Sequence, residues 1–324
     1  MEKICIVDGV TFNGREDARF CSPKCRKKYS RNKGEIPSEK ENSPVISTKP
    51  KKSQAQEKKI EENVPSMERI MAEINKKYGA GTVFRASDLL KKERLSSGIP
   101  ILDEKMGGGF LEGRIIELYG QPMAGKSLIS LLTIAQAQKK GGKCIYFDCE
   151  DTFDPVWAEE LGVDMDNLSV FKTSKGEDTF DMLFKALEGR PKIIVVDSVD
   201  SMVVKSELEN DVEKVGMALK ARLMSKAMRM LTPKNKGTLI IFINQLRSTM
   251  DMYGPKFTTP GGLALKFYAS IRLEVKKSED IHEGGKKSNP IIGQVVGFKV
   301  TKNKTAVPQQ IGSFKFFYDG KVEG

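Results

Sequence analysis

The stretch "LYGQPMAGKSLISL", residues 118–131, decides the fold of this chain. Gly120, Gly125, Lys126 and Ser127 complete the pattern G-x-x-x-x-G-K-[ST] between an apolar strand and a helical segment. In such a loop the backbone N–H groups face phosphate oxygens, the lysine neutralises phosphate charge, and the hydroxyl can ligate Mg²⁺. The sequence therefore predicts a nucleotide-binding loop and leaves open what cleavage of the nucleotide would accomplish.

Short apolar strands alternate with helical patterns from Gly113 onward, and this predicts an α/β fold with a mostly parallel sheet flanked by helices. Three later segments are strand-like with hairpin-type turns between them and predict an antiparallel extension of the sheet. The clearest parallel strands are RIIELYG, KCIYFDCE, KIIVVDS and GTLIIFINQ, and the later segments are SIRLEVKKS, VVGFKVTKNK and SFKFFYDG.

Two carboxylates follow predicted strands and are candidates for nucleotide chemistry. Asp197 ends KIIVVDS, where it can orient the hydration shell of Mg²⁺. Glu150 lies just past another strand and can position and deprotonate an attacking water. Spacing alone does not separate it from nearby carboxylates, each of which can instead cap a helix or lie exposed. These competitors are Asp148, Asp151 and Asp154.

Charge and composition suggest a polyanionic partner. The chain of 324 residues has a net charge of +11, of which residues 1–60 contribute +7, from 15 Lys/Arg and 8 Asp/Glu. Nucleic acid is a natural partner for this excess, although a solvated tail is an equal alternative. We expect a cytoplasmic protein without membrane contact, because no apolar run is long enough to span a bilayer and the first residues lack a secretory signal.

Composition also predicts the domain organisation. We expect a zinc-finger-like module at 1–31, a flexible linker at 32–64 and a segment with a short amphipathic helix at 65–95. A nucleotide-hydrolysing core follows at 96–324. The helix is expected to begin at Ser66 and stop at Gly79, with an apolar face that packs on its own core or on a neighbouring subunit.

The N-terminal cysteines predict a metal site. Cys21 and Cys25 bracket a Ser-Pro turn, Cys5 begins C-x-x-D, and the segment resembles small treble-clef-like zinc fingers. Zinc prefers four ligands and accepts carboxylate oxygen, so Asp8 can complete the set. A decayed finger without metal is the alternative. The basic run that follows favours DNA contact by this module, or instead a single-strand-binding or mediator protein as partner. It comprises Arg26, Lys27, Lys28 and Arg31.

Long ordered motifs resemble one family, the bacterial RecA-type strand-exchange recombinases. The resemblance begins near Ser66, continues to the end of the sequence and includes "FDCEDTFDPVWAEELGVDMDNL", "IIVVDSVDSM", "LIIFINQLR", "GGLALKFYASIRLEV" and "KVTKNKTAVP". It implies a RecA-like ATPase core that binds ATP and Mg²⁺. It also implies that residues 65–95 form an N-terminal oligomerisation helix and strand that dock on the next subunit. The expected assembly is a head-to-tail helical filament on single-stranded DNA that pairs with homologous duplex DNA. We expect no counterpart of the family's separate C-terminal domain, and a shortened core with an added finger raises the hypothesis of a phage origin.

The resemblance also implies roles for individual residues. Glu150 matches the catalytic carboxylate, Gln245 the glutamine that senses the γ-phosphate, and Lys302 and Lys304 the lysines that reach the ATP of the adjacent subunit. Trp157, which by itself could stack on a purine or fill core, matches an adenine-side position, as do Asp154 and Tyr318. The residues assigned to the nucleotide and its metal are Gly120, Gly125, Lys126, Ser127, Leu128, Asp154, Trp157, Asp197 and Tyr318.

Two DNA-binding loops are implied by the same resemblance, at 199–217 and 247–262. Glycines let backbone N–H groups approach phosphates, and arginines add salt-sensitive attraction. The residues expected along DNA are Met217, Arg222, Ser225, Arg229, Arg247, Gly261 and Gly262.

Two other functions compete with strand exchange. A RadA-like branch-migration ATPase also joins a zinc module to such a core, but "KNKTA" stands where that family has K-N-R-F-G. A nucleotide-switched DNA-binding regulator that does not exchange strands would not need Glu150, Lys302 and Lys304 together. We therefore predict a DNA-dependent ATPase acting in recombination and repair.

Overall fold

The computed structural model describes residues 2–5, 11–15, 17–31, 66–89, 92–205, 213–248 and 256–324. It divides the chain into two compact units, residues 1–83 and 84–324. The predicted linker at 32–64 lies outside the described residues.

The described residues of the N-terminal unit form a small hairpin and two helices. Strands β1 (Glu2–Ile4) and β2 (Thr11–Asn13) pair antiparallel, and helix α1 (Pro23–Arg31) follows. Helix α3 (Met67–Tyr78) begins where the sequence predicts, because the Ser66 hydroxyl accepts the backbone N–H of Arg69. Gly79 ends α3 with a positive φ.

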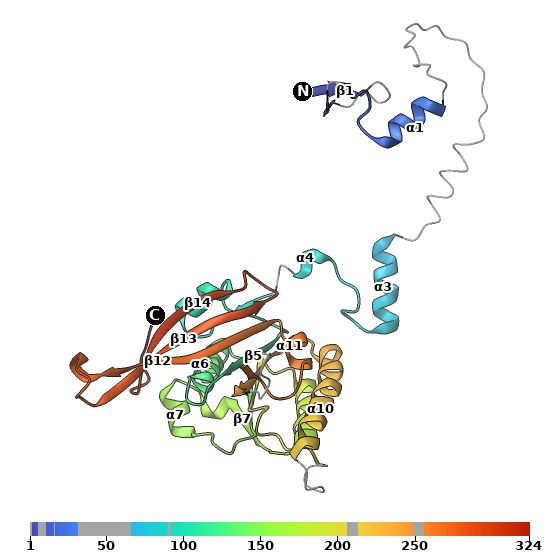
Figure 1. The fold of residues 1–324 in the computed structure, drawn as a ribbon. Coiled ribbons are helices and arrows are strands. Elements are labelled where there is room, and N and C mark those ends of the chain that lie inside the picture. Colours follow the sequence, from blue (N-terminus) through green and yellow to red (C-terminus); the bar gives the residue numbers. More distant parts are fainter. Residues whose placement is uncertain are drawn as a thin grey trace. The chain divides into compact units, whose positions relative to one another are not determined.

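The second unit is built on a nine-stranded sheet with the order β15-β14-β13-β12-β5-β9-β8-β6-β7 (Figure 1). The predicted parallel strands are confirmed as β5 (Ile115–Gly120), β6 (Cys144–Asp148), β8 (Ile193–Asp197) and β9 (Leu239–Gln245). β7 (Leu168–Lys172) adds a parallel edge strand that the sequence pattern did not single out. The α/β fold class is therefore confirmed.

The antiparallel extension is also confirmed. β12 (Ile271–His282) runs parallel to β5 and antiparallel to β13 (Ile291–Asn303), which pairs with β14 (Gln310–Phe317). β15 (Val322–Glu323) completes this edge. The β12–β13 hairpin projects beyond the rest of the sheet in Figure 1.

Smaller elements precede and follow the phosphate loop. They are α4 (Ala86–Leu89), β3 (Arg94–Leu95), α5 (Pro100–Met106), β4 (Phe110–Leu111), α7 (Pro155–Glu160), β10 (Arg247–Ser248), β11 (Phe257–Thr258) and α11 (Ala264–Tyr268). Within the range 65–95, where a helix and a strand are predicted, the described residues form α3, α4 and the two-residue strand β3, which pairs with β4 of the same chain.

Two hydrophobic layers cover the sheet because successive residues of each buried strand point to opposite faces. Val195 and Ile241 pack in the cluster that includes α6 (Lys126–Lys139). Val196 and Phe242 pack in the other cluster, with α8 (Gly176–Ala186) and α10 (Glu213–Lys234). Helices on both faces hold the strand ends in fixed positions. No helix among the described residues is long and apolar enough to cross a bilayer.

Phe242 should be essential to the second layer. Its side chain is fully buried, and its ring lies 6.4 Å from that of Phe180. We predict that Phe242→Ala lowers the free energy of unfolding by about 3–5 kcal/mol, from lost burial and the cavity left behind. Urea denaturation of the purified protein measures this. Ile311→Ala, at an exposed position of β14, should change it by less than about 0.5 kcal/mol. Equal effects of the two substitutions would contradict the assignment of the core.

Candidate nucleotide site

The phosphate loop connects the carboxyl end of β5 to the amino end of α6. Gly120 is required at the last position of β5, because a Cβ there would lie 1.9 Å from the carbonyl oxygen of Val275 on β12. Gly125 begins the helix with φ at +97°, in the left-handed region that glycine adopts without strain. Sheet and helix thus leave a loop whose N–H groups can face an anion, as the sequence predicts.

Lys126 and Ser127 occupy the first turn of α6. The Lys126 ammonium donates to the loop carbonyl oxygens of Gly120, at 3.3 Å, and Gln121, at 2.7 Å. Burial lowers the pKa of Lys126, and this is partly opposed by Asp197 and Glu150. The Ser127 hydroxyl donates to Oδ2 of Asp197 at 2.7 Å. This pairing of an alcohol with a carboxylate is a donor set that suits Mg²⁺.

Asp197 lies at the end of β8, and its side chain is almost fully buried. Burial raises the pKa of Asp197, and hydrogen bonds from Tyr146 and Ser127 lower it again. The Tyr146 hydroxyl donates to the same Oδ2 atom at 2.6 Å. Tyr146 was not singled out in the sequence, because an aromatic residue within a buried strand looks like ordinary core. The signal that the sequence offered for Tyr146 was a hydroxyl two residues before the end of β6.

Glu150 is set apart from its competitors by its partners. Its Oε1 atom accepts a hydrogen bond from Nε2 of Gln245 at 3.1 Å and another from the Ser198 hydroxyl. Glu150 follows β6, Ser198 follows β8 and Gln245 ends β9, and these three parallel strands are neighbours in the sheet. Glu150 therefore lies beside the phosphate loop in contact with a glutamine that can respond to what the loop binds.

The three competing carboxylates have structural partners. Asp148 accepts the backbone N–H groups of Thr152 and Phe153. Asp151 forms an exposed ion pair with Lys172. Asp154 caps α7 by accepting the N–H groups of Val156 and Trp157. Among these acidic residues only Glu150 bonds to side chains at the ends of two other central strands.

A cavity of about 390 Å³ adjoins the loop. Lys126, Ser127 and Leu128 line one side, and Trp157, Phe316 and Tyr318 form an aromatic wall. The ring of Phe316 contacts Trp157 and Tyr318 edge-on, with centroid distances of 6.4 and 6.1 Å. Such a wall can stack against a purine base. Gln294 also lines the cavity and was missed in the sequence, because it sits within a strand-like pattern of β13.

Lys302 and Lys304 do not join the phosphate loop of this chain. The strand register places Lys302 opposite Arg272 and the next residue, Asn303, opposite Ile271. Ile271 pairs on its other side with Ile116, near the amino end of β5. Lys302 donates to the carbonyl oxygens of Lys266 and Phe267 at 2.6 and 2.9 Å, at the end of α11. Burial, and next Lys304, lower the pKa of Lys302. Both lysines are thus at the end of β5 opposite the loop.

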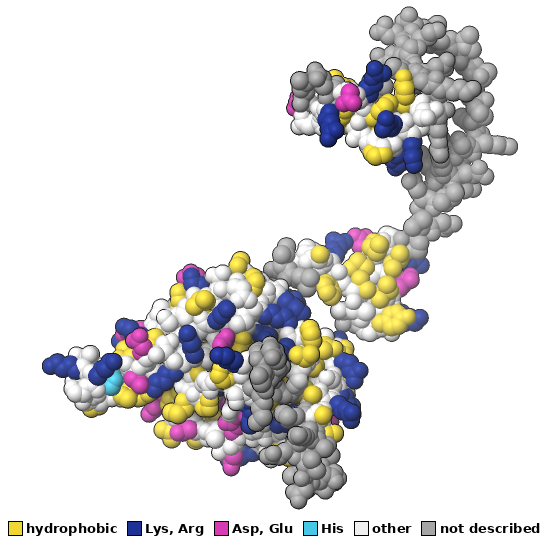
Figure 2. All heavy atoms as spheres, in the orientation of Figure 1, with side chains coloured by type: hydrophobic (Ala, Val, Ile, Leu, Met, Phe, Trp, Pro, Cys, Tyr) yellow, Lys and Arg dark blue, Asp and Glu magenta, His cyan; other side chains and the backbone are white. Residues whose placement is uncertain are grey.

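The predicted DNA residues lie on α10 and beside it. Arg222, Ser225 and Arg229 share the exposed side of α10, where Figure 2 shows gathered Lys and Arg side chains. Gly261 and Gly262 have positive φ angles and pack against this helix, so they also have a structural role. Residues 206–212 and 249–255 of the two loops, and the side chain of Met217, lie outside the described residues.

Arg247 does not extend freely at the start of the second loop. Its guanidinium pairs with Asp200, with Nε 2.9 Å from Oδ1 and Nη2 2.7 Å from Oδ2. The carboxylate of Asp200 is buried while the arginine is exposed, and the pair raises the pKa of Arg247. This contact joins the segment after β8 to the segment after β9, the starts of the two predicted DNA loops.

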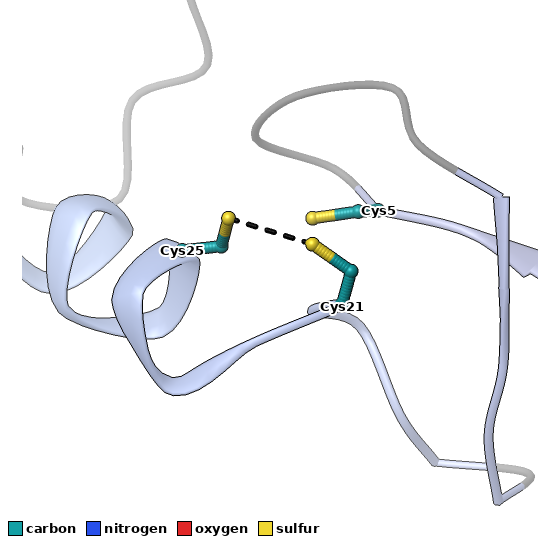
Figure 3. Close-up of side chains that lie close together, drawn as sticks. All are labelled: Cys5, Cys21 and Cys25. Carbon is teal, nitrogen blue, oxygen red and sulfur yellow. Dashed lines mark hydrogen bonds between the residues drawn. The ribbon is translucent and has the colours of Figure 1, made fainter. Parts of the chain in front are cut away.

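The three N-terminal cysteines converge (Figure 3). Cys5 follows β1, Cys21 precedes α1 and Cys25 lies in its first turn, and their sulfur atoms all lie within 4.8 Å of one another. The Sγ atoms of Cys21 and Cys25 are 3.6 Å apart. Asp8, the predicted fourth ligand, lies outside the described residues. Cys144 and Cys149 are buried in the core, where burial raises each thiol pKa to about 12, as expected of structural thiols.

Comparison with known proteins identifies relatives of the core. The family described as "RecA N-terminal domain" matches residues 65–323. Proteins named "Protein RecA" from Francisella tularensis subsp. novicida (strain U112) and subsp. tularensis (strain WY96-3418) are each 43% identical over 263 residues. These matches cover 78% of this chain and 72% of each relative.

The position of Trp157 supplies a direct test of the cavity. Trp157 is the single tryptophan of the chain, so nucleotide entering the cavity should change its fluorescence saturably. We predict that Lys126→Ala weakens this binding about 10- to 100-fold, since a hydrogen bond to a charged group contributes about 1.5–3 kcal/mol. Titration with ATP and Mg²⁺ measures it. Lys139→Ala, at the far end of α6, is the matched control. Unchanged affinity after the loss of Lys126 would contradict the assignment.

Proposed function

The chain belongs to the RecA family of ATP-dependent DNA recombinases and DNA-dependent ATPases, and we propose that the site built around Glu150 hydrolyses its ATP. The observation that carries this proposal is the bond between Glu150 and Gln245 beside Lys126, Ser127 and Asp197. Strand exchange, with binding of single-stranded and duplex DNA, is the activity of this family.

The residues present fit ATP and Mg²⁺. The loop after Gly120 and the first turn of α6 would bind the phosphates, and Lys126 would exchange its loop carbonyls for phosphate oxygens. Ser127 and Asp197 would hold Mg²⁺, which supplies positive charge against the phosphate oxygens when bound. Leu128, Trp157 and Tyr318 would contact the nucleoside. Asp154 would act on the adenine side through the position of Trp157, whose helix it caps.

Glu150 would orient the attacking water and accept its proton. Gln245 now bonds to this carboxylate, and a γ-phosphate would offer its amide a competing acceptor. A shift of Gln245 would be transmitted directly to Arg247, two residues along, at the start of the second DNA loop. This is how binding of ATP would change the conformation that faces DNA.

Assembly would complete the site. Lys302 and Lys304 lie away from their own phosphate loop, and their charge would instead stabilise the transition state at an adjacent subunit. Helix α3 has no buried residue, and its exposed Met67 and Tyr78 would pack on that neighbour (Figure 2). Heterologous packing of this kind produces an open helical filament.

DNA would lie along the outer side of α10 and the two loops that flank it. Arg222 and Arg229 would neutralise phosphates, Ser225 would donate to them, and the backbone at Gly261 and Gly262 would allow close approach. Met217 and Arg247 would complete the path. The location we propose is the cytoplasm, in association with DNA.

Glu150→Gln should separate hydrolysis from assembly. The amide keeps the shape of the side chain but accepts no proton, so we predict a fall in ATP turnover of about 10²- to 10⁴-fold with ATP binding and filaments on single-stranded DNA retained. ATPase assays with and without single-stranded DNA, and negative-stain microscopy, measure this.

The matched control is Glu159→Gln, an exposed glutamate on α7. The proposal would be overturned if ATP turnover by the wild type did not change on addition of DNA and the protein formed rings or monomers in place of filaments. That result would favour a branch-migration ATPase or a nucleotide-switched regulator.

We further propose that the N-terminal cysteines bind Zn²⁺ and so stabilise a zinc-finger-like module. Tetrahedral zinc with sulfur ligands at about 2.3 Å requires sulfur atoms about 3.8 Å apart. The Sγ atoms of Cys21 and Cys25, 3.6 Å apart, are close to this spacing, and all three sulfur atoms lie within 4.8 Å of one another. So short a segment buries little apolar surface, and a metal would replace the missing core. Exposed Lys24, Arg26 and Lys27 on α1 would then be presented to DNA, while a single-strand-binding or mediator protein is the alternative partner.

Cys25→Ser should remove this metal. We predict about one Zn²⁺ per chain in the wild type, and at least tenfold weaker retention in the variant, measured by atomic emission after dialysis against a mild chelator. Cys144→Ala removes a core thiol and should retain the metal. Equal zinc contents in the wild type and in Cys25→Ser would exclude the cysteine site. Loss of the metal in Cys25→Ser should leave the ATPase activity of the core intact.

A further inference from the structure

One buried side chain beside the proposed metal site has no role in the functions above. Tyr146 lies in the middle of β6, paired with Val195 of β8 on one side and Val170 of β7 on the other. Its ring is buried in the core cluster that includes Ala124 and Leu128. A phenylalanine ring would fill the same space in the core, so the hydroxyl of Tyr146 needs a separate explanation.

The hydroxyl is directed at the carboxylate of Asp197. Tyr146 and Asp197 lie on adjacent strands and face the same side of the sheet, and the hydroxyl donates to Oδ2 at 2.6 Å. Ser127 donates to the same oxygen at 2.7 Å. One carboxylate oxygen therefore receives two hydroxyl groups, one from the phosphate loop helix and one from the sheet.

These two donors differ in what else they do. Ser127 is itself a proposed ligand of Mg²⁺, so its orientation depends on the metal. Tyr146 is held by packing within the sheet and keeps its orientation whether or not the metal is bound. Asp197 is a buried anion, and a buried anion is costly unless donors surround it.

We propose that Tyr146 is a positioning residue for Mg²⁺ binding, whose hydroxyl holds the Asp197 carboxylate in a fixed orientation for the metal. The inference rests on the proposed ATP and Mg²⁺ site. It adds a residue that the phosphate-loop pattern does not contain. Outer-shell partners of metal ligands commonly contribute 10- to 100-fold in metal affinity.

Tyr146→Phe tests this, because it removes the hydroxyl and keeps the ring. We expect the Mg²⁺ concentration for half-maximal binding of a fluorescent ATP analogue to rise about 10- to 100-fold. Binding of the analogue in the presence of EDTA should be unchanged. The readout is equilibrium binding and does not depend on turnover.

Tyr119→Phe is the matched control. Tyr119 is also buried, and its hydroxyl bonds to Thr301 at 3.0 Å, away from Asp197. Its loss should leave the Mg²⁺ titration unchanged. In an Asp197→Asn background, Tyr146→Phe should have no further effect on that titration, since the two residues act through one contact.

The outcomes separate this inference from the proposed function. A wild-type chain that does not bind the analogue with Mg²⁺ would overturn both. Wild-type binding with an unshifted Tyr146→Phe titration would overturn the role of Tyr146 alone. A loss of binding that is equal with Mg²⁺ and with EDTA would show that the hydroxyl only supports the fold.

Discussion

The structure depends on the in-register pairing of four parallel strands, β5, β9, β8 and β6. Gly120 pairs with Gln245, and Asp148 with Asp197, so the carboxyl ends of these strands form one edge of the sheet. The phosphate loop, Asp197, Glu150 and Gln245 all follow or end these strands. A slip of one residue in any strand would turn its core side chains to the wrong face and remove its polar residue from the site.

Hydroxyl and amide groups complete what the strands bring together. Asp197 receives hydroxyls from the sheet and from α6, and Glu150 receives an amide and a hydroxyl from the neighbouring strand ends. Each carboxylate is thus held by groups on elements whose packing is fixed by the two hydrophobic layers. A reaction that depends mainly on geometry and charge requires that these oxygen atoms move little.

Contacts within the same sheet extend beyond the site. Buried Glu117 on β5 accepts the guanidinium of Arg272 on β12 and the amide of Asn244 on β9. Asn244 also donates to the carbonyl oxygen of Pro260, near the end of the second predicted DNA loop. A continuous set of contacts therefore joins the strand next to Lys302 with the segment that precedes Gly261. A buried charge in such a network fixes the relative placement of three strands, because any displacement would leave it unpaired.

The sequence by itself determined the four central parallel strands, the phosphate loop, the antiparallel extension and the family, because apolar periodicity and ordered motifs are local properties of the chain. It could not choose Glu150 from Asp148, Asp151 and Asp154 by spacing, nor find Tyr146 or Gln294 within their strands. Those assignments needed the tertiary structure, because they depend on which side chains meet across strands that are far apart in sequence. The convergence of Cys5 with Cys21 and Cys25 was likewise decided by folding, since a hairpin and a helix must pack before three sulfur atoms come within ligand distance.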